Sequence, residues 1–126
     1  PESPPYFPKD QLTDKNERFF VNEIIREKIL LNFKKEIPYS VEVITEDFKD
    51  EEAIIKIRSI IIVERDSQKG IIIGHKGVAI KNVGTKARID LENFFNKKIF
   101  LDLQVKVKKN WRSDEKLLKK FGYHQK

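Results

Sequence analysis

The sequence predicts an α+β fold in which three strands form one sheet and helices cover one of its faces. Two kinds of pattern carry this prediction. Some stretches repeat apolar residues with the 3.6-residue period of amphipathic helices, and others alternate with the two-residue period of half-buried strands. They follow one another as helix, strand, strand, helix, helix, strand and a C-terminal helix. With 126 residues, the chain is long enough for one domain with its own hydrophobic core.

The first element is expected to be a helix. Asp14 and Glu17 resemble a capping box, because a carboxylate at the first position can accept a free amide of the first turn. Apolar residues then recur at helical spacing over residues 18–33. Pro38 forbids continuation, so the helix should end near Lys35.

Two strands should follow. Residues 41–46 alternate between apolar and polar side chains, and the acidic stretch 46–52 is expected to be a solvated turn. A second alternating run occupies residues 53–63. Its last part, residues 60–63, is apolar on both sides, so both faces of the sheet should be covered there.

The second half of the chain predicts two helices around a glycine loop, a strand and a last helix. Residues 66–67 can cap a short helix that ends at Ile73, and a longer amphipathic helix should span residues 78–96. Residues 99–108 have the clearest strand alternation in the chain. A final helix is expected over residues 114–121.

Composition excludes several classes of site. The chain has no Cys and only two His, which excludes a disulfide framework and a thiolate metal site and leaves too few ligands for a His-based one. No apolar run is long enough for a transmembrane helix or the core of a signal peptide, so we expect a cytoplasmic location. The Pro-rich opening predicts an extended linker over residues 1–10 that belongs to a longer protein, followed by one domain over residues 11–126.

The positive charge is concentrated in the second half. Residues 1–64 carry 10 basic and 14 acidic side chains, whereas residues 65–96 carry 6 and 3, and residues 97–126 carry 10 and 3. A basic surface favours polyanions, because each neutralised phosphate releases condensed counterions. A lysine-rich solvated face is an equally good explanation of charge alone.

The motif that carries chemistry is Gly74-His75-Lys76-Gly77. It is neither a P-loop nor a dinucleotide-binding loop, since the glycine spacings differ from both. Two glycines remove both Cβ atoms where a phosphate backbone must come close, and the helix that follows adds the positive end of its dipole. A GxxG loop between two helices that clamps about four nucleotides is the signature of the KH module. A tight turn that needs glycine for its geometry alone is the simpler alternative, and the flanking elements favour RNA binding.

The order of the elements is that of a type II KH domain, and one family matches in detail. Residues 61–74, IIVERDSQKGIIIG, resemble the C-terminal KH domain of the Era family of bacterial GTPases. So do residues 8–14, PKDQLTD, the pair Pro38-Tyr39, and residues 105–112, VKVKKNWR. The resemblance covers roughly residues 5–123. Many members place Lys directly after the first loop glycine, whereas here His75 stands there and Lys76 follows.

The resemblance implies a function in ribosome biogenesis. Members of the family carry an N-terminal GTPase domain before the KH domain, and the KH domain binds the 3′ end of 16S rRNA. It therefore implies that this chain binds that RNA in 30S ribosomal subunit assembly. It implies no cofactor for these residues, GTP and magnesium for a GTPase domain in cis, a monomeric state, and peripheral contact with the inner membrane. No catalytic or metal-ligating set is expected here.

The candidate RNA-binding residues fall into three groups. The loop and the helix before it contribute Lys69, Gly70, Ile71, Ile73, Gly74, His75, Lys76 and Gly77. The end of the last strand contributes Lys108, Lys109 and Trp111, where Trp111 is either a stacking platform or a cap on the sheet edge. The family match adds Arg18, for which a plain surface role is the alternative. A protein–protein module with a solvated basic face remains the alternative function.

Overall fold

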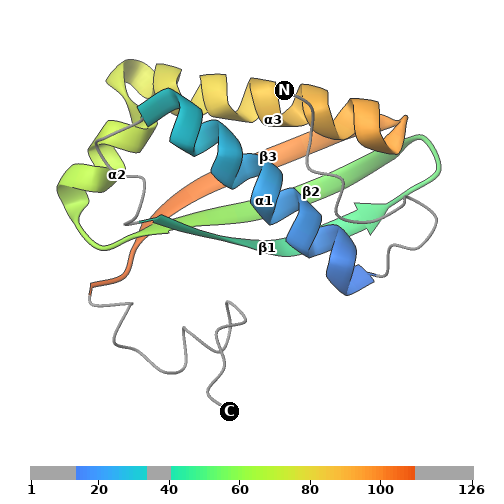
Figure 1. Ribbon diagram of the computed structural model, residues 1–126, viewed down its shortest axis with the longest axis horizontal. Coiled ribbons are helices and arrows are strands. Elements are labelled where there is room, and N and C mark those ends of the chain that lie inside the picture. Colours follow the sequence, from blue (N-terminus) through green and yellow to red (C-terminus); the bar gives the residue numbers. More distant parts are fainter. Residues whose placement is uncertain (1–13, 34–40, 110–126) are drawn as a thin grey trace, which may run out of the picture.

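The computed structural model describes residues 14–33 and 41–109, and they form a two-layer α+β fold (Figure 1). The elements, in chain order, are α1 (Asp14–Phe33), β1 (Val41–Asp50), β2 (Ile54–Val63), α2 (Asp66–Ile73), the single 3₁₀ turn η2 (His75–Gly77), α3 (Val78–Phe95) and β3 (Lys98–Val107). The predicted fold class is confirmed. The helix expected at 114–121 lies outside the described residues.

The sheet is mixed, with the order β1-β2-β3. β1 and β2 form an antiparallel hairpin, in which Val41 pairs with Val63. β2 and β3 are parallel, and Val63 pairs with Val107. Parallel neighbours need a crossover connection, and α2 with α3 provides it. Both parallel strands therefore end at the same edge of the sheet, which is the edge where α2 begins (Figure 1).

β1 is longer than the sequence predicts. The expectation of a strand over 41–46 and a solvated acidic turn over 46–52 is wrong in its second part, because β1 continues to Asp50. A bulge between Thr45 and Asp47 shifts the pairing with β2 by one residue. The extra residue breaks the two-residue alternation, which is the signal that defines a strand in a sequence. Beyond the bulge, Phe48 is buried in the core again.

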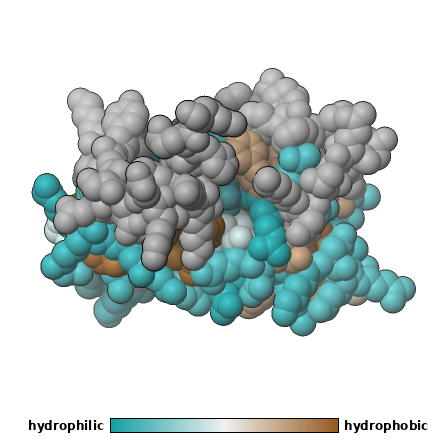
Figure 2. Space-filling view, turned by 90° about the horizontal axis from the view of Figure 1, so that it is seen from below, coloured by the Kyte–Doolittle hydropathy of each residue, from teal (hydrophilic) through white to brown (hydrophobic). Residues whose placement is uncertain are grey.

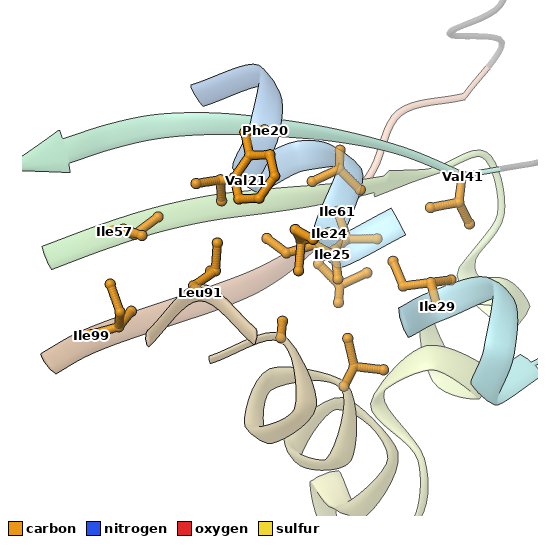
Figure 3. Packing of buried hydrophobic residues seen from close by; sticks show 14 of the residues in the cluster. Phe20, Val21, Ile24, Ile25, Ile29, Val41, Ile57, Ile61, Leu91 and Ile99 are labelled. Atoms are coloured by element: carbon orange, nitrogen blue, oxygen red, sulfur yellow. The ribbon is translucent and has the colours of Figure 1, made fainter. Parts of the chain in front are cut away.

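The core lies between the helices and one face of the sheet. Figure 3 shows side chains of α1 directed toward Leu91 of α3 and toward Ile57 and Ile99 of the sheet. The Phe20 and Phe94 rings lie 4.2 Å apart between centroids, which fixes the start of α1 against the end of α3. At the other end of α1, the side chain of Lys86 donates to Asn32 at 3.1 Å. α1 and α3 are thus antiparallel. No helix among the described residues has the length and hydrophobicity needed to cross a membrane.

The opposite face of the sheet is apolar at one end and mostly polar elsewhere, apart from the exposed Phe100. Ile60 and Ile62 are buried there, as expected from the apolar end of β2. Lys56 and Arg58 of the same strand are exposed, and Arg58 pairs with Asp47 at 3.2 Å. Seen from the side where β1 lies, the described surface is largely hydrophilic, with smaller hydrophobic patches (Figure 2).

The start of α2 is capped by a residue that the sequence analysis did not single out. Residues 66–67 were expected to cap this helix, but it already includes Asp66. Instead, Oε1 of Gln68 accepts the backbone N–H groups of Glu64, at 3.0 Å, and Arg65, at 2.9 Å. A side-chain amide that reaches back in this way satisfies donors that the helix itself cannot.

A partly buried carboxyl lies on the outer side of α1. Burial raises the pKa of Glu23, Arg26 opposes the increase, and the nearby Glu42 adds to it. A carboxyl whose pKa is raised in the folded state stabilises the fold at low pH, where it is neutral. This contribution is lost as the pH rises through the folded-state pKa. At neutral pH, the charge of Glu23 therefore destabilises the domain.

Glu23→Gln should raise the Tm at pH 7, because it removes the charge that burial disfavours while it keeps the size of the side chain. The difference from the unmodified chain should shrink as the pH falls below the folded-state pKa of Glu23. Thermal unfolding followed by circular dichroism between pH 3 and pH 7 measures this. Glu52→Gln, at an exposed position after β1, is the control. An equal Tm difference across this pH range would contradict the assignment.

Candidate nucleic-acid interface

The turn between α2 and α3 depends on a glycine at position 74. Its backbone has φ 78° and ψ 177°, a region that residues with a Cβ atom essentially do not enter. A Cβ atom at this position would also lie 2.6 Å from the Cβ of Ala79 and 2.9 Å from its backbone nitrogen. The Gly74 amide donates to the Gly70 carbonyl at 2.9 Å, which ends α2. The backbone therefore passes against the first turn of α3 at a distance that only glycine permits.

The last two residues of the loop are held in left-handed conformations. Gly77 has φ 78° and ψ 13°, with open space where a Cβ atom would lie. Lys76 has φ 55° and ψ 28°, which is unfavourable for a lysine. Strain of this kind is concentrated at functional sites, where it places a side chain that a relaxed backbone would direct elsewhere. Here the strained residue is Lys76, which carries one of the two polar side chains of the loop.

The side chains of His75 and Lys76 project into solvent. Both residues are exposed, and neither side chain forms a hydrogen bond or an ion pair with another described residue. The loop is followed directly by α3, whose first turn carries the positive end of the helix dipole. A cation beside a glycine-lined backbone and a helix N-terminus is suited to an oxyanion such as phosphate.

The helix before the loop contributes less apolar surface than the sequence predicts. Ile72 is fully buried in the core, and Ile73 is partly buried against it. Ile71 is 40% exposed and Gly70 is exposed, so these two positions remain open to a ligand. Lys69 is partly buried on the same helix.

A groove with both aliphatic and cationic side chains lies between α3 and β3. It has a volume of about 260 Å³. Its lining consists of Ile80, Lys81, Gly84, Thr85, Arg88, Leu101 and Leu103. The α3 residues recur at three- and four-residue spacing and so form one face of the helix, while the two leucines share one face of the strand. Within the described residues β3 pairs with β2 alone, so its other edge borders the groove.

The sequence alone does not predict this groove, although part of its signal is present there. The spacing of the α3 residues was visible, but the stripe toward the core was the stronger pattern in that helix. From the sequence, Gly84 is a glycine inside a helix, which weakens the helix and either allows close packing or is merely tolerated. Nothing in the sequence reveals that α3 and β3 leave a gap between them, since their packing depends on the parallel pairing of β2 and β3.

Two of the other predicted cations lie at the same end of the sheet as the loop. The backbone of Lys108 donates to the Val63 carbonyl at 2.8 Å, directly before α2, and the side chains of Lys108 and Lys109 are exposed. Lys109 lines a surface hollow near the start of α2 together with Glu64, Arg65 and Asp66, so acidic and basic side chains balance there. Trp111 lies outside the described residues and stays a prediction.

Arg18 does not lie with the loop. Its guanidinium donates to the Glu46 carbonyl at 2.8 Å and to the Thr45 carbonyl at 3.4 Å, at the bulge of β1. The neighbouring Phe20 packs on the last turn of α3, about 24 Å along that helix from its first residue. The structure thus gives Arg18 a role in holding the bulge, away from the other predicted site residues. No cluster of potential metal ligands is present in the described part of the chain.

Replacing either loop glycine should destabilise the domain, and Gly74→Ala should cost more than Gly77→Ala. Gly77→Ala forces a residue with a Cβ atom into a left-handed conformation, at about 1–2 kcal/mol. Gly74→Ala adds the clash with the backbone of Ala79. Urea unfolding of both variants measures the difference. Equal losses of stability would contradict the close approach at position 74.

Comparison with known proteins places this geometry in a family context. The sequence matches the KH domain family over residues 36–112. It is 54% identical over 127 residues to GTPase Era of Syntrophus aciditrophicus, and 50% identical over 125 residues to GTPase Era of Coxiella burnetii. These alignments cover 99% of this chain but 42% of each relative, so the chain spans about two fifths of their length.

Two solved structures are similar over almost all of the chain. One is a crystal structure of Era in complex with MgGDPNP and nucleotides 1506–1542 of 16S ribosomal RNA, with a TM-score of 0.84 and 37% identity. The other is Aquifex aeolicus Era bound to GDP and AlF4⁻, with a TM-score of 0.83 and 38% identity. Each alignment covers 99% of this chain and 42% of the other.

Proposed function

Because this chain belongs to the KH domain family and aligns with Era over 99% of its length, we propose that it binds single-stranded RNA. In the loop at residues 74–77, two glycines, the strained Lys76 and the N-terminus of α3 lie together at the surface. This arrangement is the observation that carries the proposal. The loop holds the phosphates of the RNA.

The groove between α3 and β3 holds the bases. Its apolar lining from Ile80, Leu101 and Leu103 offers aliphatic surface to the faces of unpaired bases. The cations Lys81 and Arg88 lie on the same side of α3 as the groove, where they can meet the phosphates of a strand that runs along it. A duplex buries its bases by stacking, so this arrangement favours a single strand.

The 3′ end of 16S rRNA is the RNA that we propose. The support is the similarity to an Era structure that holds nucleotides 1506–1542 of this RNA. On the same footing we propose that the natural protein acts in 30S ribosomal subunit assembly, with GTP and magnesium used by a GTPase domain in cis. The 126 residues themselves contain no nucleotide-binding loop. Cytoplasmic location, a monomeric state and contact with the inner membrane stay predictions.

The combined variant His75→Asp and Lys76→Asp should weaken binding to an RNA of the 16S rRNA 3′ end by about a hundredfold or more. The reason is that two polar or charged contacts worth about 1.5–3 kcal/mol each would be replaced by repulsion. Fluorescence anisotropy titrations at two salt concentrations measure the affinity. For the unmodified chain, the affinity should fall steeply as salt increases.

The matched control changes the charge by the same amount at exposed positions away from the loop. Lys49→Asp combined with Asn93→Asp serves this purpose, and it should leave RNA affinity within a few-fold of the original. Unchanged affinity of the loop variant would contradict the proposal. Equal affinity for the 16S rRNA 3′ end and for a scrambled RNA would contradict the proposed sequence. If the chain bound a protein partner with an affinity that does not depend on salt, and bound no RNA, the alternative of a protein-interaction module would be favoured.

A further inference from the structure

Gly84 is a glycine that the fold itself does not require. It lies in the interior of α3, where a glycine weakens a helix relative to alanine. It does not have the positive φ that would call for glycine, unlike the two glycines of the loop. A Cβ atom at this position would meet only the Cδ1 atom of Leu103, at 3.5 Å, which is ordinary van der Waals contact. Alanine would therefore fit and would stabilise the helix.

What Gly84 does provide is space within the groove. It lies between Ile80 and Arg88 on the same face of α3, and the side chain of Leu103 faces it from β3. None of the residues that line this groove is aromatic. A base here must be held by contacts with aliphatic groups, and such contacts weaken steeply when a gap of even 1 Å opens. A missing Cβ atom lets a flat ring lie directly against the helix backbone.

We propose that Gly84 sets the depth of a single nucleobase site in the groove between α3 and β3, and that the domain keeps it at a cost in stability. This inference rests on the proposed RNA binding and adds a residue that determines how closely one base can approach. The base lies on the backbone at position 84, beside Leu103, while Lys81 and Arg88 remain available to its phosphates.

Gly84→Ala tests the inference because its two expected effects have opposite signs. The Tm should rise by a few degrees, since alanine favours the helix. Affinity for the 16S rRNA 3′-end RNA should fall several-fold, because the added Cβ atom holds the base away from the helix backbone. Asn93→Ala is the matched control. It improves helix propensity on an exposed part of α3 that does not line the groove, so it should raise the Tm without a change in affinity.

A set of abasic RNAs identifies the base. Each RNA lacks the base of one nucleotide, and affinity is measured for the unmodified chain and for Gly84→Ala. If one base occupies the site, the loss caused by Gly84→Ala should disappear for the RNA that lacks this base and persist for the others. A loss that persists for every abasic RNA would overturn the single-base site.

Two other results would also overturn the inference. A lower Tm for Gly84→Ala would show that the fold needs glycine at this position. Unchanged RNA affinity, with the unmodified chain binding normally, would show that the space at Gly84 is not used by RNA. Failure of the unmodified chain to bind RNA at all would instead contradict the proposed function, so the two proposals can fail separately.

Discussion

The candidate interface depends on one steric constraint, which is the contact between the backbone at Gly74 and the first turn of α3. No Cβ atom fits at position 74, because the nitrogen and Cβ of Ala79 occupy that place. This close approach allows α3 to begin with only four residues between it and the end of α2, and it leaves His75 and Lys76 at the tip of the turn. The cost is a lysine in a left-handed conformation. A chain that could accept a side chain at position 74 would have a wider turn and a different loop.

The rest of the fold places a groove next to this turn. The parallel pairing of β2 and β3 requires a crossover, and α3 is the longer part of it. α3 must therefore run back over the sheet beside the edge strand β3, where it borders the groove along one face while its other face packs in the core. α1 fixes α3 from the other side through Phe20 and through the ion pair between Lys28 and Asp90, at 2.5 Å. The loop and the groove are thus two consequences of one connection.

Sequence periodicity predicted the elements well because most of them bury one face. The alternation in β3 and the apolar end of β2 were read correctly, and the glycine loop could be proposed as a site because the pattern that defines it is local. The errors and omissions have physical causes. The bulge at Thr45 interrupts the alternation of β1, and the cap of α2 comes from Gln68 because a side-chain amide can reach back over three residues. The role of Arg18 at the bulge depends on contacts between residues far apart in the sequence, as does the groove. No local pattern encodes them.

The measurement that tests the central claim most directly is a map of the residues whose amides respond to RNA. The uniformly ¹⁵N-labelled chain is titrated with the RNA of the 16S rRNA 3′ end, and amide chemical shifts are followed by NMR. The largest changes should fall on residues 70–77, on the groove face of α3 from residue 80 to residue 88, and on residues 101–107 of β3. The hairpin of β1 and β2 around residues 47–58 should change little. Changes centred on that hairpin, with the loop and the groove unaffected, would contradict the account.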